Sequence, residues 1–314
     1  MLRSVKKGHI SGMTDQMRVF DRRLVRAHRD RAAAQLGDHD FLFREVAERL
    51  ADRLDDFNRG FPVALDLGCR GGALARALDG HGGIERLIRC DPSPAFSRRA
   101  GGLSLAAEEE ALPFAEAVFD LVISDLSLHW VNDLPGALVQ IRRSLKPDGL
   151  FLAAMFGGET LKELRQVLLE ADLAEEGGAS PRVSPFADVR DAGDLLQRAG
   201  FALPVVDLDT ITVTYADAFA LMRDLRGMGE ANAVVERRGG FTRRTTMMAA
   251  ARLNQEKFQD RQGRTPATFQ ILYLTAWAPH EAQQKPRKPG SARARLADAL
   301  GTIEISAGDK AQPK

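Results

Sequence analysis

The pattern of apolar and polar positions predicts two helices before the first strand of this chain, over residues 18–34 and 41–57. In the second segment, four apolar side chains recur every four residues, a spacing that places them on one face of a helix. These side chains are Leu42, Val46, Leu50 and Leu54. We therefore expect an N-terminal helical lead-in over residues 1–57 that packs one apolar stripe against the rest of the protein.

Short apolar runs that each lead into a loop follow this lead-in and alternate with helical stretches. The runs read PVALDLG, RLIRCD, AVFDLVISDL and GLFLAAMFG. Buried strands of a parallel sheet have this near-continuous apolar character, and the alternation with helices indicates right-handed crossovers between neighbouring strands. The pattern predicts an α/β fold.

Two longer strands are predicted near the end of the chain, VVDLDTITVTY and TFQILYLTAWAP, with mostly helical residues between them. Such a pair indicates an antiparallel edge of the sheet. We therefore expect a mostly parallel sheet whose last strand is antiparallel, with a helical insertion at about residues 216–262. The α/β domain would cover residues 58–280, and residues 281–314, rich in Pro, Gly and charge, would form a flexible tail.

Charge and cysteine content exclude several classes of protein. The 44 Lys and Arg residues nearly balance the 43 Asp and Glu residues, so the formal net charge is +1 and a nucleic-acid partner is not expected. No apolar run approaches the roughly 20 residues of a membrane-spanning helix. The two cysteines, Cys69 and Cys90, are too few for a disulfide framework and are expected to be small core residues, which fits a reducing, cytoplasmic compartment.

Candidate ligand-binding residues follow the predicted strands, because ligands of open α/β sheets lie beyond the carboxyl ends of the strands. The first strand leads into Asp66-Leu67-Gly68-Cys69-Arg70-Gly71-Gly72, where glycines permit a tight turn close to a ligand. The second leads into Asp91, which is placed to accept hydrogen bonds from ribose hydroxyls. A phosphate-binding G-x-G-x-x-G motif would need glycine where the chain has Arg70 and Ala73.

A third acidic loop, Glu108-Glu109-Glu110-Ala111-Leu112-Pro113-Phe114, offers a carboxylate for an adenine amino group and an apolar bend for the purine face. Acids after three successive strand segments suit ribose and adenine, but nothing among them neutralises a pyrophosphate. A positively charged nucleoside such as S-adenosylmethionine satisfies this pattern better than a dinucleotide does. A degenerate or empty nucleoside site is the alternative.

Several motifs together resemble the class I S-adenosylmethionine-dependent methyltransferases over about residues 45–160. They are LDLGCRGG, the acid Asp91, EEEALPF, VFDLVISDLSLHWV and LKPDGLF. The resemblance implies a Rossmann-like methyltransferase sheet with S-adenosylmethionine as cofactor. It also implies the cofactor contacts, which are Asp66, Gly68, Gly72, Asp91, Glu108 and the segment that begins at Ser124.

Arg70 departs from the family pattern, which usually has glycine at this middle position. Its side chain would either turn outward or intrude on the methionine carboxylate of the cofactor, with which a guanidinium pairs well. We expect cofactor binding to be retained and count Arg70 among the cofactor-binding residues.

The second half resembles one branch of this family, which contains the mitochondrial complex I assembly factor that acts as a protein arginine hydroxylase. The most discriminating stretch is MGEANA, within LMRDLRGMGEANAV. This resemblance implies a protein substrate, an arginine of the iron–sulfur subunit at the quinone end of complex I. The malonyl-carrier-protein O-methyltransferases of biotin synthesis share the first half, so carboxylate methylation is an alternative. A non-catalytic assembly factor is a third.

Two residues are candidates for direct contact with a substrate. His129 follows a predicted strand and would act as a general base, or would only pack its loop against the sheet. Glu230, close to Asn232, would bind a guanidinium, since a carboxylate pairs with that group through two hydrogen bonds. As a helix-capping turn, the same stretch needs no function.

Four arginines near the N-terminus recur at helical spacing and predict a basic stripe. They are Arg18, Arg22, Arg26 and Arg29. The stripe would be solvated, or would contact an acidic protein surface or lipid headgroups at the inner membrane. His28 and Asp30 match a His-x-Asp iron motif, but residues two apart point to different sides of a helix, so we predict no metal site.

Overall fold

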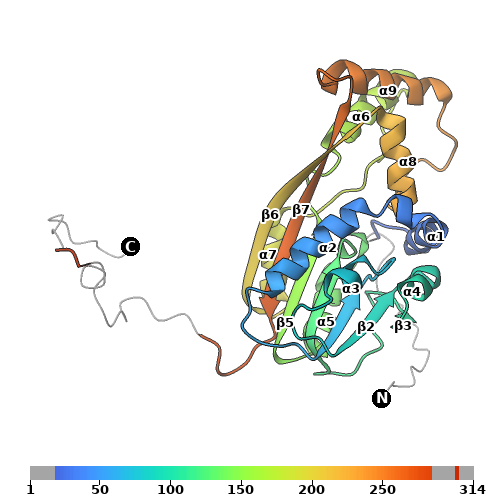
Figure 1. The fold of residues 1–314 in the computed structure, drawn as a ribbon. Helices are drawn as coiled ribbons and strands as arrows, with labels where there is room; N and C mark the ends of the chain where they lie inside the picture. The colour runs from blue at the N-terminus through green and yellow to red at the C-terminus, as the bar shows by residue number, and fades with distance from the viewer. Residues whose placement is uncertain (1–17, 285–300, 304–314) are drawn as a thin grey trace. The chain divides into compact units, whose positions relative to one another are not determined.

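The computed structural model describes residues 18–284 and 301–303 and contains a seven-stranded sheet in the order β3-β2-β1-β4-β5-β7-β6 (Figure 1). The strands are β1 Val63–Leu67, β2 Arg86–Asp91, β3 Leu103–Ala106, β4 Phe119–Asp125, β5 Leu145–Phe156, β6 Ala202–Tyr215 and β7 Thr265–Trp277. The first five pair in parallel, and β7 runs antiparallel between β5 and β6. The prediction of a mostly parallel sheet with an antiparallel last strand is confirmed.

The short edge strand β3 has no counterpart among the apolar runs of the sequence. Its residues, LSLA, are largely accessible to solvent, and Leu103 is 59% exposed. A strand at the sheet edge need not be apolar on both faces, so the hydrophobic pattern does not reveal it. β3 fixes the start of the third acidic loop, because its last residue, Ala106, pairs with Asp91 of β2.

Helices cover both faces of the sheet (Figure 1). They are α1 Arg22–Ala32, α2 Phe41–Leu54, α3 Ala73–Ala77, α4 Pro94–Ala100, α5 Leu134–Ser144, α6 Lys162–Glu176, α7 Val189–Arg198, α8 Ala218–Met228 and α9 Arg244–Phe258, with the short 3-10 helices η2 Leu36–Asp38 and η3 Leu128–Trp130. Neighbouring residues of β1 point to opposite faces, so Ala64 belongs to the core beneath α2 and Leu65 to the core beneath α5 and α7.

The predicted apolar stripe of the second lead-in helix is confirmed. Its four members in α2 are all buried in the first core, and they are Leu42, Val46, Leu50 and Leu54. Phe43, beside this stripe, is also buried and is part of the same core. α2 is therefore fixed against the sheet, and its neighbour Phe43 becomes available to the site described below.

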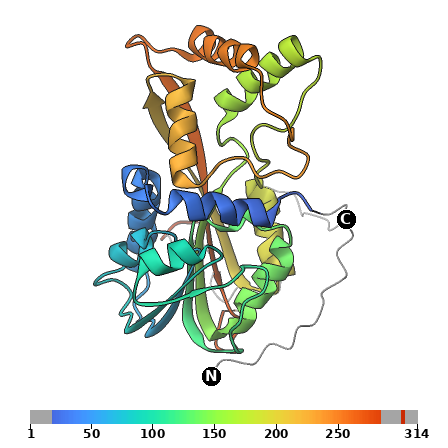
Figure 2. The ribbon, with the colours of Figure 1, turned by 90° about the vertical axis from the view of Figure 1, so that its right-hand side faces the viewer.

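The insertion between β6 and β7 contains α8 and α9 and forms a layer beyond the carboxyl ends of the parallel strands, as Figure 2 shows. β6 and β7 pair from Ala202 and Trp277 to Tyr215 and Thr265, so this long ribbon carries the insertion away from the sheet. α9 packs against α6, which follows β5, and α1 packs against both α4 and α8. α1 thus lies between the sheet and the insertion (Figure 2).

Among the described residues, 280–284 and 301–303 belong to a unit separate from residues 18–279. Of the predicted tail, the structure describes only 281–284 and 301–303, and the first 17 residues of the predicted lead-in also lie outside the described residues. Across the part of the chain that is described, no helix combines the length and apolarity needed to cross a membrane.

Candidate functional site

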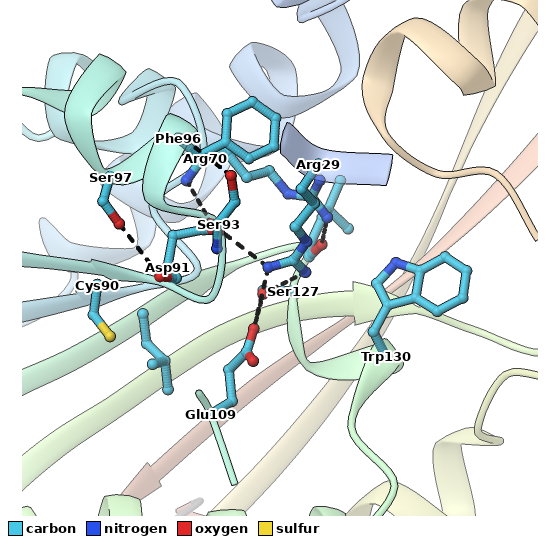
Figure 3. A network of polar contacts seen from close by, with 12 residues as sticks. Arg29, Arg70, Cys90, Asp91, Ser93, Phe96, Ser97, Glu109, Ser127 and Trp130 are labelled. Carbon is cyan, nitrogen blue, oxygen red and sulfur yellow. Dashed lines mark hydrogen bonds and ion pairs between the residues drawn. The ribbon is translucent and has the colours of Figure 1, made fainter. Parts of the chain in front are cut away.

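Arg29 of α1 is the centre of a buried ion-pair network at the carboxyl ends of the parallel strands (Figure 3). Its Nη1 lies 3.5 Å from Oδ2 of Asp91 and 3.2 Å from Oε1 of Glu109, and its Nη2 donates to Oγ of Ser127 over 2.9 Å. These three acceptors come from the end of β2, the loop after β3 and the loop after β4. Acids that follow neighbouring strands thus surround one cation, and this cation belongs to the chain itself.

The predicted basic stripe is wrong for two of its four arginines. Arg29 is fully buried, and Arg22 pairs with the buried carboxylate of Glu109. Arg26 points away from the site, with its side chain 51% exposed. A single solvated face therefore does not exist on α1, because half of the predicted stripe neutralises acids at the strand ends.

A signal for this inward orientation was present in the sequence. Arg22 and Arg29 are seven residues apart, which is close to two helical turns, and Val25 and Ala32 lie between and beyond them at intervals of three and four residues. Both apolar residues are buried in α1. The two arginines share a helix face with buried apolar neighbours, which the spacing of the arginines alone does not reveal.

The acid that enters the network from the third loop is Glu109, whereas the expected contact, Glu108, lies at its rim. Glu109 is fully buried, while the side chain of Glu108 is 40% exposed and pairs with Arg22. Burial alone would raise the pKa of the Glu109 carboxyl, but Arg22 and Arg29 hold this pKa at about 2. Three consecutive glutamates in a loop have no periodicity, so the sequence does not indicate which one faces inward.

The turn after β1 requires glycine where the sequence places it. Gly68 has a φ of +82°, and a Cβ atom there would lie 2.1 Å from Cβ of Ser127, closer than two carbons can approach. Gly72 has a φ of +76° and precedes α3. Arg70 also adopts a positive φ of 43°, which is uncommon for a residue other than glycine. The turn therefore keeps the shape of a glycine-rich loop, although its middle residue is an arginine.

Two carboxylates beside this turn have unpaired oxygens. Both oxygens of Asp66, and Oδ1 of Asp125, are buried without a hydrogen-bond partner among the described residues. Burial raises the pKa of Asp66 to about 8 and raises the pKa of Asp125 well above its usual value. The predicted contact Ser124 differs, because its Oγ donates to the carbonyl of Leu67 over 2.7 Å and joins β4 to β1. Unpaired buried carboxylates need a donor, which a ligand with an amino group supplies.

Asp66→Asn is expected to stabilise the protein more at about pH 8 than at about pH 5. The pKa of Asp66 in the fold, about 8, lies above its ordinary value of 3.8. The folded protein therefore keeps a proton that the unfolded chain releases, and wild-type stability falls as the pH rises between these two values. Thermal midpoints measured across this range test the expectation, with Asp207→Asn, an exposed acid of β6, as the control. Parallel pH profiles for wild type and Asp66→Asn would contradict it.

The sequence left open whether the side chain of Arg70 turns outward or inward, and in the structure it points inward. Its side chain is buried, and its guanidinium carbon lies 4.3 Å from the centroid of the Phe43 ring. Nη2 donates to the carbonyl of Leu126 over 2.5 Å and forms an ion pair with Glu230. The arginine that replaces the usual glycine therefore connects the turn to the insertion.

The two candidate catalytic residues lie in direct contact. Oε2 of Glu230 is 3.0 Å from Nε2 of His129 and accepts from Nε1 of Trp130 over 2.8 Å, while Oε1 pairs with Arg70. Burial alone would raise the pKa of Glu230, but Arg70 and His129 hold it at about 2. Burial lowers the pKa of His129, and its Nδ1 has no hydrogen-bond partner among the described residues. A neutral His129 that donates from Nε2 keeps a basic Nδ1.

A cavity of about 250 Å³ borders this cluster on the side of the insertion. Its walls are mostly apolar side chains of α6, α8, α9, the end of β5 and the neighbouring loops, among them Phe156, Phe186 and Met222. Glu230 is part of its lining, and so is Asn232, whose Nδ2 donates to the carbonyl of Pro181 over 2.7 Å. Neither Asp91 of the strand-end network nor the nearby Asp66 lines this cavity. Glu230 therefore faces a second compartment.

Cysteine and histidine do not form another reactive centre in the described part of the chain. Cys69 and Cys90 are free and buried, which confirms them as small core residues, and burial raises the pKa of both thiols. No three His, Cys, Asp or Glu side chains of the described residues are grouped so that they could hold a metal ion. His28 instead contacts the carbonyl of Ala231, with Nδ1 3.1 Å away.

Comparison with known proteins identifies the fold. Residues 65–153 match the family model described as a methyltransferase domain. The YcgJ protein of Bacillus subtilis has a similar structure, with a TM-score of 0.51 and 15% identity over 74% of this chain and 98% of that chain. A Haemonchus contortus phosphoethanolamine N-methyltransferase 2, solved with S-adenosylhomocysteine, also gives a TM-score of 0.51 and 15% identity over 82% of this chain and 60% of that chain. The fold and the site define a protein of the class I methyltransferase type.

Curated relatives place the chain more narrowly. It is 47% identical to the mitochondrial arginine-hydroxylase NDUFAF5 of Danio rerio over 90% of this chain and 89% of the relative, and 46% identical to that of Homo sapiens over 91% and 84%. A malonyl-[acyl-carrier protein] O-methyltransferase of a Methylovorus strain is 33% identical over 93% and 97%. The chain belongs to the family of the arginine-hydroxylase NDUFAF5, as the resemblance predicted.

Proposed function

We propose that this protein binds S-adenosylmethionine and hydroxylates an arginine side chain of another protein. The observation that supports cofactor binding most directly is the set of acceptors from three strand ends around the guanidinium of Arg29. Such acceptors suit a cation and ribose hydroxyls, and Asp66 has two further oxygens without a donor. The residues fit the cofactor once the guanidinium of Arg29 moves away from these acceptors.

The residues proposed to hold the cofactor follow from their positions. They are Asp66, Gly68, Arg70, Gly72, Asp91, Glu108 with its neighbour Glu109, and Ser124. When bound, the cofactor supplies a sulfonium with an activated methyl group. The chain contributes acidic acceptors in a place from which water is largely excluded, where an opposite charge has its greatest effect.

The target side chain is proposed to enter the cavity beside Glu230. The apolar walls would pack against the methylene groups of an arginine, and the carboxylate of Glu230 would bind its guanidinium through two hydrogen bonds. Relatives that are 43–47% identical and are named arginine-hydroxylase support arginine as the target.

Hydroxylation inserts one oxygen atom of dioxygen into a C–H bond, and the other atom leaves as water after uptake of two electrons and two protons. The proposed reaction therefore requires dioxygen and a two-electron reductant as co-reactants. The proposed roles of the chain are to hold the guanidinium at Glu230 and to exclude water with the cavity walls. Nδ1 of His129 would relay one of the two protons that are taken up to form water.

The proposed substrate is an arginine of the iron–sulfur subunit at the quinone end of complex I, as the family resemblance implies. Intact-mass analysis of that subunit, from cells with and without the gene, tests this proposal. We expect the subunit to lack one oxygen atom when the gene is deleted. Loss of a methylene unit would instead support methyl transfer, and failed assembly without a mass change would support a non-catalytic scaffold; either result contradicts hydroxylation.

Glu230→Gln is expected to abolish modification of the target without lowering cofactor affinity, because the amide lacks the negative charge that pairs with a guanidinium. Glu236→Gln, an exposed acid six residues further on, is the matched control and should modify the target normally. Mass analysis of the target and calorimetric titration of the cofactor provide the two readouts. Equal loss of both properties would indicate a folding defect instead of a binding role.

Methyl transfer to the carboxylate of a malonyl carrier protein is the second candidate, supported by relatives that are 33–36% identical and carry that name. It requires alignment of the carboxylate with the methyl sulfonium. Purified protein with methyl-labelled cofactor and malonyl carrier protein distinguishes the candidates, since label on the malonyl group would contradict hydroxylation as the main activity.

The location of the protein stays a prediction. The arginine-hydroxylase relatives are described as mitochondrial, whereas a cytoplasmic protein in peripheral contact with the inner membrane is expected from the sequence. Of the four arginines behind that expectation, Arg18 and Arg26 remain on the surface. Salt-sensitive co-sedimentation with anionic vesicles would support membrane contact, and a protein that does not co-sediment would contradict it.

A further inference from the structure

We infer that Arg70 couples the two compartments of the site, so that the cofactor binds first and thereby releases Glu230 to hold the target guanidinium. This inference rests on the proposed function and adds to it an order of binding and the residue that enforces this order. Arg70 is a positioning residue in this scheme, because it acts on the target through Glu230.

Arg70 belongs to both compartments. Its backbone N–H donates to Oδ2 of Asp91 over 3.1 Å, so its main chain is part of the strand-end network (Figure 3). Its guanidinium pairs with Glu230, which lines the apolar cavity. No other link is needed between the proposed cofactor position and the proposed target position, since one side chain spans them.

The guanidinium of Arg70 keeps donors for an additional anion. Its Nε is buried without a hydrogen-bond partner among the described residues, and its Nη1 makes one long contact, 3.4 Å, to the carbonyl of Met228. A buried donor without a partner is costly, so an incoming carboxylate would be favoured at this place. The methionine part of the cofactor carries such a carboxylate.

Glu230 does not have both oxygens available while Arg70 holds it. Oε1 pairs with Arg70, and Oε2 is shared between His129 and Trp130. A target guanidinium that binds through two hydrogen bonds needs both carboxylate oxygens on one side. Withdrawal of Arg70 frees Oε1 for the target, and one of the two donors at Oε2 then gives way to the second hydrogen bond.

The balance of buried charges also makes binding of the target depend on the cofactor. Arg70 and Glu230 are both buried and neutralise each other. A second guanidinium brought to Glu230 alone would leave one uncompensated positive charge in a buried place, which is strongly unfavourable. A carboxylate at Arg70 restores neutrality, so the cofactor and the target arginine are expected to bind cooperatively, and the coupling must be reciprocal.

The test uses the full chain and three probes. S-Adenosylhomocysteine has the amino-acid carboxylate and no methyl group to transfer, 5′-methylthioadenosine has the nucleoside without the amino-acid part, and N-acetyl-arginine amide presents a guanidinium. We expect S-adenosylhomocysteine to raise the affinity for the arginine probe by about tenfold or more, and 5′-methylthioadenosine to leave it unchanged. N-Acetyl-lysine amide, which cannot pair with a carboxylate in the same way, should show no such increase.

Trp130 gives a second readout, because its Nε1–H donates to Glu230. The chain has two tryptophans, so the indole resonance of Trp277 serves as an internal reference in NMR spectra. We expect S-adenosylhomocysteine, but not 5′-methylthioadenosine, to shift the indole N–H resonance of Trp130. A purely structural Arg70 would give the same small effect with both nucleosides.

Variants of Arg70 test its role in the coupling. Arg70→Met should make the affinity for the arginine probe independent of S-adenosylhomocysteine, and Arg70→Lys should restore part of the dependence. Arg143→Met, an exposed arginine of α5, is the matched control and should retain the full effect. If Arg70→Met does not fold, the comparison of the two nucleosides on the wild-type protein still tests the coupling.

The possible outcomes separate this inference from the proposed function. Binding of S-adenosylhomocysteine with no change in arginine-probe affinity would overturn the coupling and leave cofactor binding intact. Equal effects of the two nucleosides would overturn the role of the carboxylate, and so would failure of the arginine probe to bind with S-adenosylhomocysteine present. If neither nucleoside binds, both this inference and the proposed cofactor are contradicted.

Discussion

Arg29→Met is expected to lower the free energy of unfolding by about 3–5 kcal/mol, because removal of one partner leaves buried charges without compensation. Methionine keeps an unbranched chain but lacks the guanidinium that Asp91 and Glu109 share. In a domain of this size, each kcal/mol lowers the thermal midpoint by roughly 2–4 °C. Thermal and urea unfolding of the ligand-free protein measure the loss.

Arg26→Met is the matched control for this prediction. Arg26 lies on the same helix, is half exposed, and its ion pair with Asp30 is long, at 3.9 Å. Its replacement should change stability by no more than about 0.5 kcal/mol. The cofactor should also stabilise Arg29→Met more than it stabilises wild type, since its positive charge takes the place of the missing guanidinium. Equal losses in the two variants would show that Arg29 does not anchor the buried network.

Asp91→Asn is expected to weaken S-adenosylmethionine binding by about 10- to 100-fold, which corresponds to the loss of one hydrogen bond to a charged group. Oδ1 of Asp91 accepts from the backbone of Ser93 over 2.8 Å, and Oδ2 faces Arg29 and the N–H of Arg70. The substitution keeps the size of the side chain and removes its charge. Isothermal titration with the cofactor measures the affinity.

The control for Asp91 is Asp207→Asn, an exposed acid of β6 that should bind the cofactor as wild type does. Because the network also supports the fold, the thermal midpoint of ligand-free Asp91→Asn must be measured beside its affinity. A variant that keeps wild-type affinity would mean that the carboxylate of β2 does not contact the ligand.

The sheet could be predicted from the sequence because buried strands and amphipathic helices leave strong periodic patterns. The stripe from Leu42 to Leu54 and the long pair β6 and β7 were predicted for this reason. β3 was missed, since an edge strand with Leu103 largely exposed has no apolar run to detect. Patterns reveal which side chains are buried in a core, and they are silent for a short edge strand such as β3 that has no buried side chain.

The site could be predicted only in part from the sequence, for a different reason. Asp91 and the glycine turn follow strands directly, so their place could be derived from the topology. The inward arginine Arg29 was missed, because the charge pattern alone does not separate a solvated arginine from one that faces a buried acid. Its shared stripe with Val25 and Ala32 was the signal that could have revealed it. The choice of Glu109 over Glu108 depends on a loop conformation that the sequence does not encode in any period.

Isothermal titration of the ligand-free protein with S-adenosylmethionine tests the central claim. This claim is that the acceptors at three strand ends, Asp91, Glu109 and Ser127, bind a cationic nucleoside in place of Arg29. Saturable heat is expected, with a dissociation constant in the micromolar range and a clear loss of affinity in Asp91→Asn. Absence of heat above dilution at high-micromolar ligand would contradict the claim, and the acids would then serve only to bury the arginines of this chain.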